Sequence, residues 1–136
     1  MSQGLVKDFS DWLVVSDIDG TLNTKWRTLP KNNLASIKRF VTQLGGHFTL
    51  ASGRNVDSLR KHYHRLPINN TPAIVLNGAG IYDFKKEEMI RFNAINEKGK
   101  DLVKDVLNKH PSLEVEICTP DNILLINPLI FGPALV

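Results

Sequence analysis

The chain has 136 residues, a length typical of one ordinary domain that can bury a core of its own. Hydrophobic residues make up 42% and charged residues 23%, which is close to globular averages and argues against a disordered polypeptide. The net charge is +3, but the 17 Lys and Arg residues are scattered, so we expect mild attraction for anions and no nucleic-acid partner. The first residues do not resemble a signal peptide and no apolar run reaches membrane-spanning length, so we expect a soluble, cytoplasmic protein with no membrane partner.

A short apolar run near the start of the chain ends in two carboxylates. Residues 13–16 predict a buried strand, and Asp17 and Asp19 follow it. In an extended chain these two side chains share a face, where they would repel each other unless they hold a cation such as Mg²⁺ or act as an acid and base pair. Gly20 permits a sharp turn, to which Thr21 adds a hydroxyl and an amide. An ordinary strand that ends in an Asp-Gly turn is the structural alternative.

The next predicted elements form a strand–helix–strand unit. Apolar residues spaced three and four apart predict a helix that begins near Pro30 and ends at Gly45. A second short strand, residues 47–51, follows it. The two strands should be parallel with a right-handed crossover. Asp17 and Ser52 should therefore meet at the carboxyl edge of the sheet, where open α/β folds bind ligands.

The segment after the second strand carries groups that suit an anion. Ser52 offers a hydroxyl, Gly53 an unobstructed amide and Arg54 a guanidinium. The structural alternative is a helix cap, in which Ser52 or Asn55 begins a helix over residues 56–66. Both interpretations can hold together, because the amino terminus of a helix is itself an anion site.

Five side chains with metal-binding or nucleophilic chemistry receive no role. His62 and His64 are about 200° apart around the predicted helix, so they cannot share a metal, and we expect solvated surface histidines. His47 and His110 stand alone. Cys118 is the single cysteine, so no internal disulfide forms, and its apolar neighbours predict a small core residue.

The remaining elements continue the mixed α/β pattern. Residues 72–76 predict a third buried strand, followed by a glycine turn and a hairpin through residues 83–86. Its glycines do not make a dinucleotide fingerprint, because the third glycine and a following helix are missing. We then expect a strand at 89–94, a helix at 97–109 with Leu102, Val103, Val106 and Leu107 on one face, and paired strands at 113–117 and 123–126.

Three of these segments resemble motifs of one known family. Residues 17–22, Asp-Ile-Asp-Gly-Thr-Leu, resemble the DxDGT(L/V) first motif of the haloacid dehalogenase-like phosphohydrolases. Residues 50–54 resemble the second motif in the (T/S)GR form of the Cof-like, class IIB branch, and residues 77–82 resemble its NGAxIY element. The resemblance covers nearly the whole chain. It implies the amino-terminal part of a Rossmann-like parallel-sheet core in residues 1–84 and the beginning of an α/β cap domain in residues 85–136.

The resemblance also implies a chemistry. The expected activity is a Mg²⁺-dependent phosphatase that hydrolyses small phosphate monoesters, such as sugar phosphates, through an aspartyl phosphate. Asp17 would be the nucleophile and Asp19 the general acid and base, and both would hold Mg²⁺, Asp17 through its carboxylate and Asp19 through its backbone carbonyl. The residues expected to bind the phosphate group are Thr21, Ser52, Gly53, Arg54 and Asn77.

Two further motifs of the family, a lysine and a later acidic cluster, belong to a core segment that returns after the cap. Residues 128–136 contain no Lys, Asp or Glu, so the chain is expected to be an incomplete fragment of such a phosphatase. An unpaired edge beside the first strand would then expose apolar surface and favour marginal stability, self-association or docking of a missing carboxyl-terminal core segment. The alternatives are a phosphosugar mutase of similar fold and a catalytically inactive truncated chain that serves as an anion-binding module.

Overall fold

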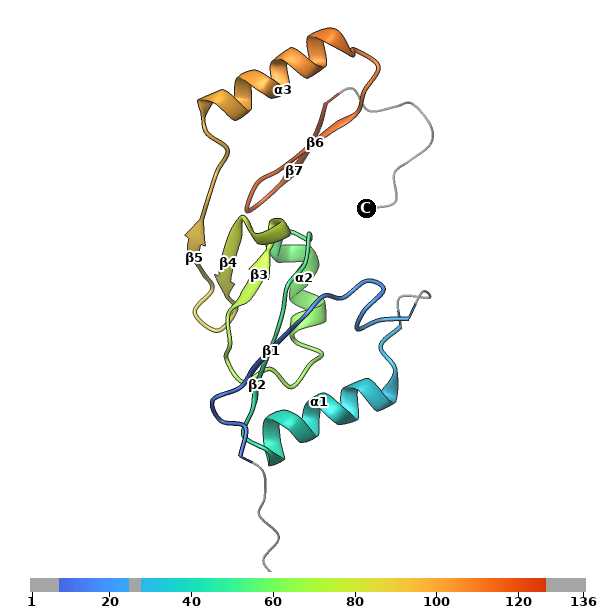
Figure 1. The fold of residues 1–136 in the computed structure, drawn as a ribbon, viewed down its shortest axis with the longest axis vertical. Coiled ribbons are helices and arrows are strands. Elements are labelled where there is room, and N and C mark those ends of the chain that lie inside the picture. The colour runs from blue at the N-terminus through green and yellow to red at the C-terminus, as the bar shows by residue number, and fades with distance from the viewer. Residues whose placement is uncertain (1–7, 25–27, 127–136) are drawn as a thin grey trace, which may run out of the picture.

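The computed structural model describes residues 8–24 and 28–126, which form an elongated α/β molecule with α1 near one end and α3 at the other (Figure 1). In chain order the elements are β1 (Leu13–Ser16), α1 (Lys31–Gln43), β2 (His47–Leu50), α2 (Val56–Tyr63), β3 (Ala73–Val75), a 3₁₀ turn (Leu76–Gly78), β4 (Gly80–Asp83), β5 (Glu88–Phe92), α3 (Glu97–Lys109), β6 (Val115–Cys118) and β7 (Ile123–Ile126). Within this described part, no helix is long and apolar enough to cross a membrane.

The predicted strand–helix–strand unit is present. β1 and β2 pair in parallel, with Leu13 opposite His47, and α1 makes the connection between them. β3 continues in the same direction beside β2 through a single parallel bridge between Ala51 and Ile74. The α/β class with a parallel sheet is therefore confirmed, and the carboxyl ends of β1, β2 and β3 lie at one edge.

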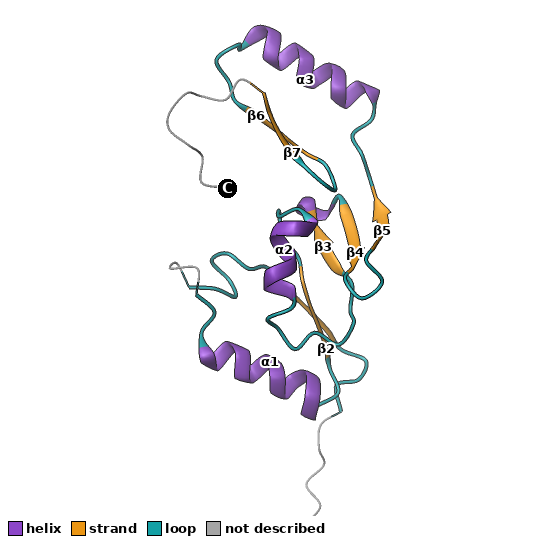
Figure 2. Ribbon diagram, turned by 180° about the vertical axis from the view of Figure 1, so that it is seen from behind, coloured by secondary structure: helices purple, strands orange, loops and turns teal. Residues whose placement is uncertain are grey.

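The core of the described chain gathers around β2, β3 and α2, which lie against one another in Figure 2. Leu50 and Leu59 are fully excluded from solvent, at 0% exposure each. α2 begins where Asn55 accepts a hydrogen bond through Oδ1 from the Ser58 backbone N–H, at 3.0 Å. Asn55, one of the two predicted caps, is thus the one that starts this helix.

β1 lies at an open edge of the sheet. Among the described residues it pairs only with β2, and Leu13 is 53% exposed, with Trp12, Val14 and Val15 also exposed. The prediction of a buried strand is therefore wrong for β1 as it stands here, because nothing in the described ranges covers its second side. The expectation of an exposed apolar edge beside this strand is confirmed.

The elements after β3 lie at the predicted positions in the sequence, but α3 is less buried than its apolar residues suggest. β4 pairs antiparallel with β3 and β5, and β6 pairs antiparallel with β7. α3 runs from Glu97 to Lys109, as predicted, yet buries none of its residues, and Leu102 is 64% exposed. Of the four apolar residues expected on one face of this helix, Leu102 is exposed, whereas Val103, Val106 and Leu107 are half-buried.

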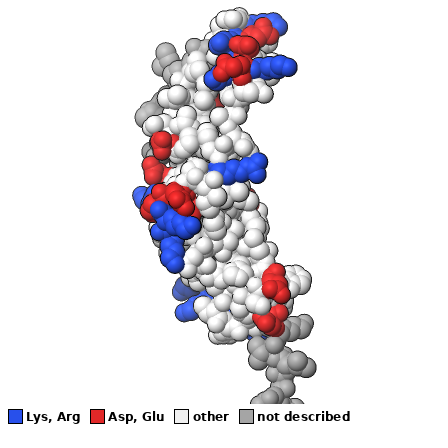
Figure 3. All heavy atoms as spheres, turned by 90° about the vertical axis from the view of Figure 1, so that its left-hand side faces the viewer, with Lys and Arg blue, Asp and Glu red and all other residues white. Residues whose placement is uncertain are grey.

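Charged side chains of both signs are interspersed on the face of the molecule in Figure 3. Along α3 they form ion pairs within the helix: Lys100 with Glu97 at 2.6 Å, and Lys109 with Asp105 at 2.7 Å. Pairs of this spacing stabilise an exposed helix by only a few tenths of a kcal/mol. They explain how α3 forms although it buries little apolar surface.

Candidate active site

The loops that follow β1, β2 and β3 line one solvent-open cavity at the carboxyl edge of the sheet. Its volume is about 270 Å³, and its lining includes one predicted site residue from the first loop, two from the second and one from the third. The full lining is Asp17, Ala51, Ser52, Gly53, Ile74, Asn77 and Gly78. Parallel strand topology thus brings Asp17 and Ser52 together as expected.

Backbone hydrogen bonds hold these loops in place. The Ala51 N–H donates to the Ser16 carbonyl at 2.9 Å, which continues the β1–β2 ladder to the cavity. The Ser52 N–H donates to the Ile74 carbonyl at 3.0 Å, and the Ser52 carbonyl accepts from the Asn77 N–H at 3.1 Å. The cavity walls are therefore part of the sheet, which keeps Ser52 buried and fixed.

Asn77 stands in an unusual turn directly over Gly53. Leu76 and Asn77 both have positive φ, 54° and 53°, a conformation that non-glycine residues rarely adopt. A Cβ added to Gly53 would lie 2.8 Å from Oδ1 and 3.1 Å from Nδ2 of Asn77. A side chain at position 53 would have to displace the Asn77 amide, which occupies the space beside the glycine.

Asp17 and Asp19 have different surroundings. Asp17 lines the cavity, and no other described residue forms a hydrogen bond or ion pair with its carboxylate. Asp19 Oδ2 lies 2.7 Å from Arg54 Nη2 in an ion pair. The backbone N–H of Arg54 also donates to Ser52 Oγ at 3.3 Å, which ties Arg54 to the cavity wall.

The chain between the two carboxylates turns instead of continuing as a strand. The Ile18 carbonyl accepts hydrogen bonds from the N–H groups of Leu22 and Asn23, at 3.1 and 2.8 Å, and the Ile18 side chain is 1% exposed. The expectation of an extended chain through Asp19 is therefore wrong, because a tight turn begins at once. Thr21 lies exposed in this turn and is not among the residues that line the cavity.

His62 is more enclosed than the sequence indicated. It is half-buried and lines a small cavity of about 20 Å³ with Ile18 and Leu22 from the turn after β1. Burial lowers the pKa of His62, the positive charge of Arg54 lowers it further, and the negative charge of Asp19 opposes this shift. The prediction of a solvated surface histidine is thus wrong for His62, whereas His64 is exposed. No signal in the sequence alone placed α2 against the Asp17–Asn23 turn.

The comparison with known proteins identifies the family. A family model described as haloacid dehalogenase-like hydrolase matches residues 14–132. The chain belongs to the haloacid dehalogenase-like hydrolases. This confirms the resemblance drawn from the three motifs.

Individual relatives of this hydrolase are phosphatases by name. A candidate phosphatase from Buchnera aphidicola subsp. Baizongia pistaciae is 31% identical over 104 residues, which is 75% of this chain and 38% of that protein. The pyridoxal phosphate phosphatase YbhA from Escherichia coli K12 is 27% identical over 99 residues, 72% of this chain and 35% of that protein. The subclass IIB sugar phosphatase BT4131 has the same fold, with a TM-score of 0.71 at 22% identity over 87% of this chain and 45% of that one. The hydrolase chain therefore spans less than half the length of each.

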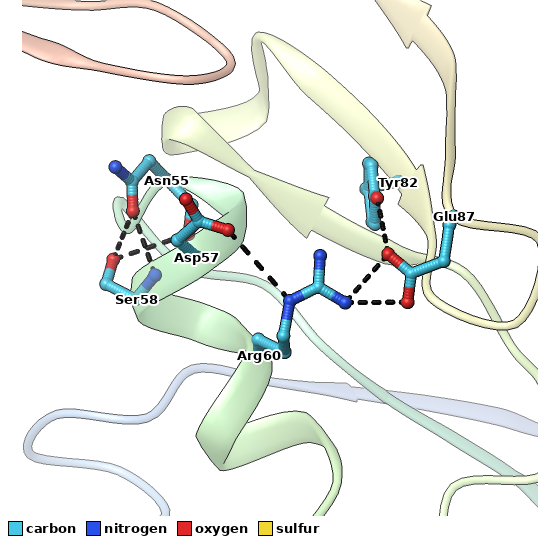
Figure 4. A network of polar contacts seen from close by, with 6 residues as sticks. All are labelled: Asn55, Asp57, Ser58, Arg60, Tyr82 and Glu87. Carbon is cyan, nitrogen blue, oxygen red and sulfur yellow. Dashed lines mark hydrogen bonds and ion pairs between the residues drawn. The ribbon is translucent and has the colours of Figure 1, made fainter.

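A second polar network, which sequence analysis missed, ties α2 to the β4–β5 hairpin (Figure 4). Arg60 on α2 pairs with Glu87 in the turn between β4 and β5, and the Tyr82 hydroxyl donates to Glu87 Oε2 at 2.9 Å. The hydrogen bond from Arg60, and then that from Tyr82, lowers the pKa of Glu87. One of these contacts joins residues 27 positions apart and the other joins residues five apart across a turn, so no local sequence pattern predicts them.

Proposed function

We propose that this chain carries the nucleophile of a phosphatase that acts on small phosphate monoesters, and that Asp17 is that nucleophile. The observation that supports this most directly is the position of the Asp17 carboxylate, which has no partner among the described residues and lines a cavity with Ser52, Gly53 and Asn77. The two curated relatives are phosphatases by name, in agreement with this chemistry.

In the proposed reaction an oxygen of the Asp17 carboxylate attacks the phosphorus atom of the monoester. The bond from phosphorus to the leaving oxygen breaks, and Asp19 gives that oxygen a proton. Asp19 then takes a proton from a water molecule, which attacks phosphorus and breaks the bond to Asp17. Inorganic phosphate and an alcohol are released, and both carboxyl groups return to their starting states.

Donors around the cavity would position the phosphoryl oxygens. The Ser52 hydroxyl accepts a hydrogen bond from the Arg54 backbone, so its own hydrogen remains available to donate to a phosphoryl oxygen. Gly53 and Asn77 also line the cavity, and the Asn77 side-chain amide lies beside Gly53. Together with Thr21 from the adjacent turn, these groups would stabilise negative charge on the phosphoryl group as the bonds rearrange.

Mg²⁺ fits the donors at this site and is part of the proposal. Mg²⁺ prefers oxygen ligands and is commonly bound through one or two carboxylates while it keeps several waters. The free Asp17 carboxylate and the Asp19 backbone carbonyl would hold the ion. When bound, it would supply positive charge that neutralises the phosphoryl oxygens. Across residues 8–24 and 28–126, no group of three or more His, Cys, Asp and Glu is arranged to hold a metal.

Substrate choice would depend on the segment beyond the core. We infer that residues 1–84 belong to the core and that residues 85–136 begin a cap, with the β4–β5 hairpin at the junction. A small phosphorylated metabolite, such as a sugar phosphate, is the proposed class of substrate. The names of YbhA and BT4131 support this class, because they are a pyridoxal phosphate phosphatase and a sugar phosphatase.

The experiment that tests this function is hydrolysis of p-nitrophenyl phosphate with and without Mg²⁺. We expect Mg²⁺-dependent turnover that Asp17→Asn abolishes. Asp105→Asn is the matched control, because it removes the same charge from an exposed pair with Lys109 on α3. Turnover retained by Asp17→Asn would contradict the assignment, and absence of turnover in the unsubstituted chain would favour the binding-module alternative.

A further inference from the structure

We propose that Arg54 exchanges partners during binding: its guanidinium holds Asp19 when the cavity is empty, and an incoming phosphate-type anion competes with Asp19 for it. Arg54 would then be a positioning residue that restrains the general acid until the substrate arrives. The inference rests on the proposed function, since it requires that the cavity beside Asp17 binds an anion.

The hydrogen-bond donors of the Arg54 side chain are only partly satisfied. A guanidinium has five N–H donors and favours two-pronged contacts with oxyanions. Within the described residues, the Arg54 side chain makes one contact, Nη2 to Asp19 Oδ2 at 2.7 Å. Its Nε is buried and has no hydrogen-bond partner. A second acceptor would therefore be favourable at this side chain.

The backbone of Arg54 is fixed beside the cavity, whereas its side chain is held by the one contact with Asp19. The Arg54 N–H donates to Ser52 Oγ, and its carbonyl accepts from the Leu76 N–H at 3.0 Å. Arg54 directly follows the cavity residues Ser52 and Gly53. A change of partner therefore requires rotation of the side chain alone and leaves the loop in place.

The ion pair between Arg54 and Asp19 is weak enough to be replaced. The Arg54 side chain is 27% exposed and the Asp19 side chain 49% exposed. Ion pairs at such positions are screened by water and salt and contribute little. A phosphate group carries more negative charge than Asp19 and offers several oxygens, so it would compete effectively. Displaced Asp19 would then be free to take up a proton from the solvent and to carry it to the leaving oxygen.

A double-mutant cycle on phosphate affinity tests the exchange without any need for turnover. Inorganic phosphate binding is measured by calorimetry for the unsubstituted chain, Asp19→Asn, Arg54→Gln and the double variant. Asp19→Asn should tighten phosphate binding. The fold-change should be roughly two to five times larger when Arg54 is present than in the Arg54→Gln background. Asp57→Asn, which removes an exposed carboxylate of α2 at 3.9 Å from Arg60, is the matched charge control and should show no such dependence on Arg54.

A second measurement avoids any substitution of Arg54, in case Arg54→Gln does not fold. The side-chain N–H resonances of Arg54 should shift when phosphate is added to the unsubstituted chain, together with the carboxyl resonance of Asp19. Phosphate binding that leaves both resonances unchanged would overturn the exchange, as would an equal effect of Asp19→Asn in both backgrounds. If none of the proteins binds phosphate, the proposed function fails and the exchange fails with it. If phosphate binds without the expected dependence on Arg54, the exchange alone fails, so the two failures are distinguishable.

Discussion

Arg60 and Glu87 are joined by a single guanidinium nitrogen that contacts both carboxylate oxygens. Arg60 Nη1 lies 2.6 Å from Oε1 and 2.7 Å from Oε2 of Glu87 (Figure 4). Glu87 has a φ of 56°, in the left-handed region that non-glycine residues avoid. The ion pair thus coincides with a strained turn residue, and it fixes α2, which begins beside the cavity, against the β4–β5 hairpin.

Replacement of this carboxylate should loosen the hairpin. We expect Glu87→Gln to lower the urea midpoint of unfolding, because the charged contact with Arg60 is lost while the strained backbone remains. Glu88→Gln is the matched control, since Glu88 is the next residue and has only a longer contact with Lys86, at 3.5 Å. Equal midpoints for the two variants would contradict a special role for Glu87.

The same pair predicts a dependence on pH. A carboxyl group with a lowered pKa in the folded state contributes stability above its unfolded pKa and loses it as the pH falls through the folded value. The difference in the urea midpoint of unfolding between the unsubstituted chain and Glu87→Gln should therefore be largest at neutral pH and should shrink below pH about 4. A difference that does not change over this range would show that the charge of Glu87 is not what stabilises the turn.

Two glycines near the site should respond differently to Ala. Gly53→Ala should displace the Asn77 amide, so we expect several-fold weaker phosphate binding with a loss of stability below about 1 kcal/mol. In an Asn77→Ala background, Gly53→Ala should affect phosphate binding less.

A Cβ added at Gly20 would meet no atom within 4 Å, but Gly20 has a φ of +82°. Gly20→Ala should therefore lower the unfolding free energy by about 1 kcal/mol. Calorimetric binding and urea unfolding of the same variants separate these effects.

His62 should make the chain less stable in mild acid. Its pKa is lowered in the folded state, so the unfolded chain binds the proton more readily, and protonation favours unfolding. The unfolding free energy should therefore fall as the pH drops through and below about 6.5. His62→Gln should reduce this fall, with His110→Gln, at an exposed position, as the control. A fall of the same size in both variants would contradict the account.

Leu59 and Leu102 test how the apolar residues of the chain are divided between core and surface. Leu59→Ala should lower the unfolding free energy by about 2–5 kcal/mol, because the side chain is 0% exposed in the core. Leu102→Ala on α3 should change it by less than about 0.5 kcal/mol, because that side chain is 64% exposed. Urea unfolding of the two variants compares them directly, and a large loss in Leu102→Ala would show that the α3 face is packed.

The sequence predicted the elements better than their environment. Hydrophobic period and turn residues located α3 and β7 closely, because these signals are local. The exposure of β1 and Leu102 could not be predicted from the pattern, since an apolar residue is buried only if another element covers it. In the site, parallel topology brought Asp17 and Ser52 together, whereas the Arg54 contact with Asp19 and the enclosure of His62 depend on side-chain directions across distant segments.

Asp17 should become covalently phosphorylated during turnover, and trapping of that intermediate is the sharpest test of its role. The Asp19→Asn chain, which should hydrolyse the intermediate slowly, is incubated with p-nitrophenyl phosphate and Mg²⁺, treated with borohydride and analysed by tandem mass spectrometry. Borohydride reduces an aspartyl phosphate to homoserine, so the account predicts homoserine at position 17 and at no other Asp, and none in the Asp17→Asn/Asp19→Asn chain. Release of p-nitrophenol without this conversion, or conversion at a different Asp, would contradict it.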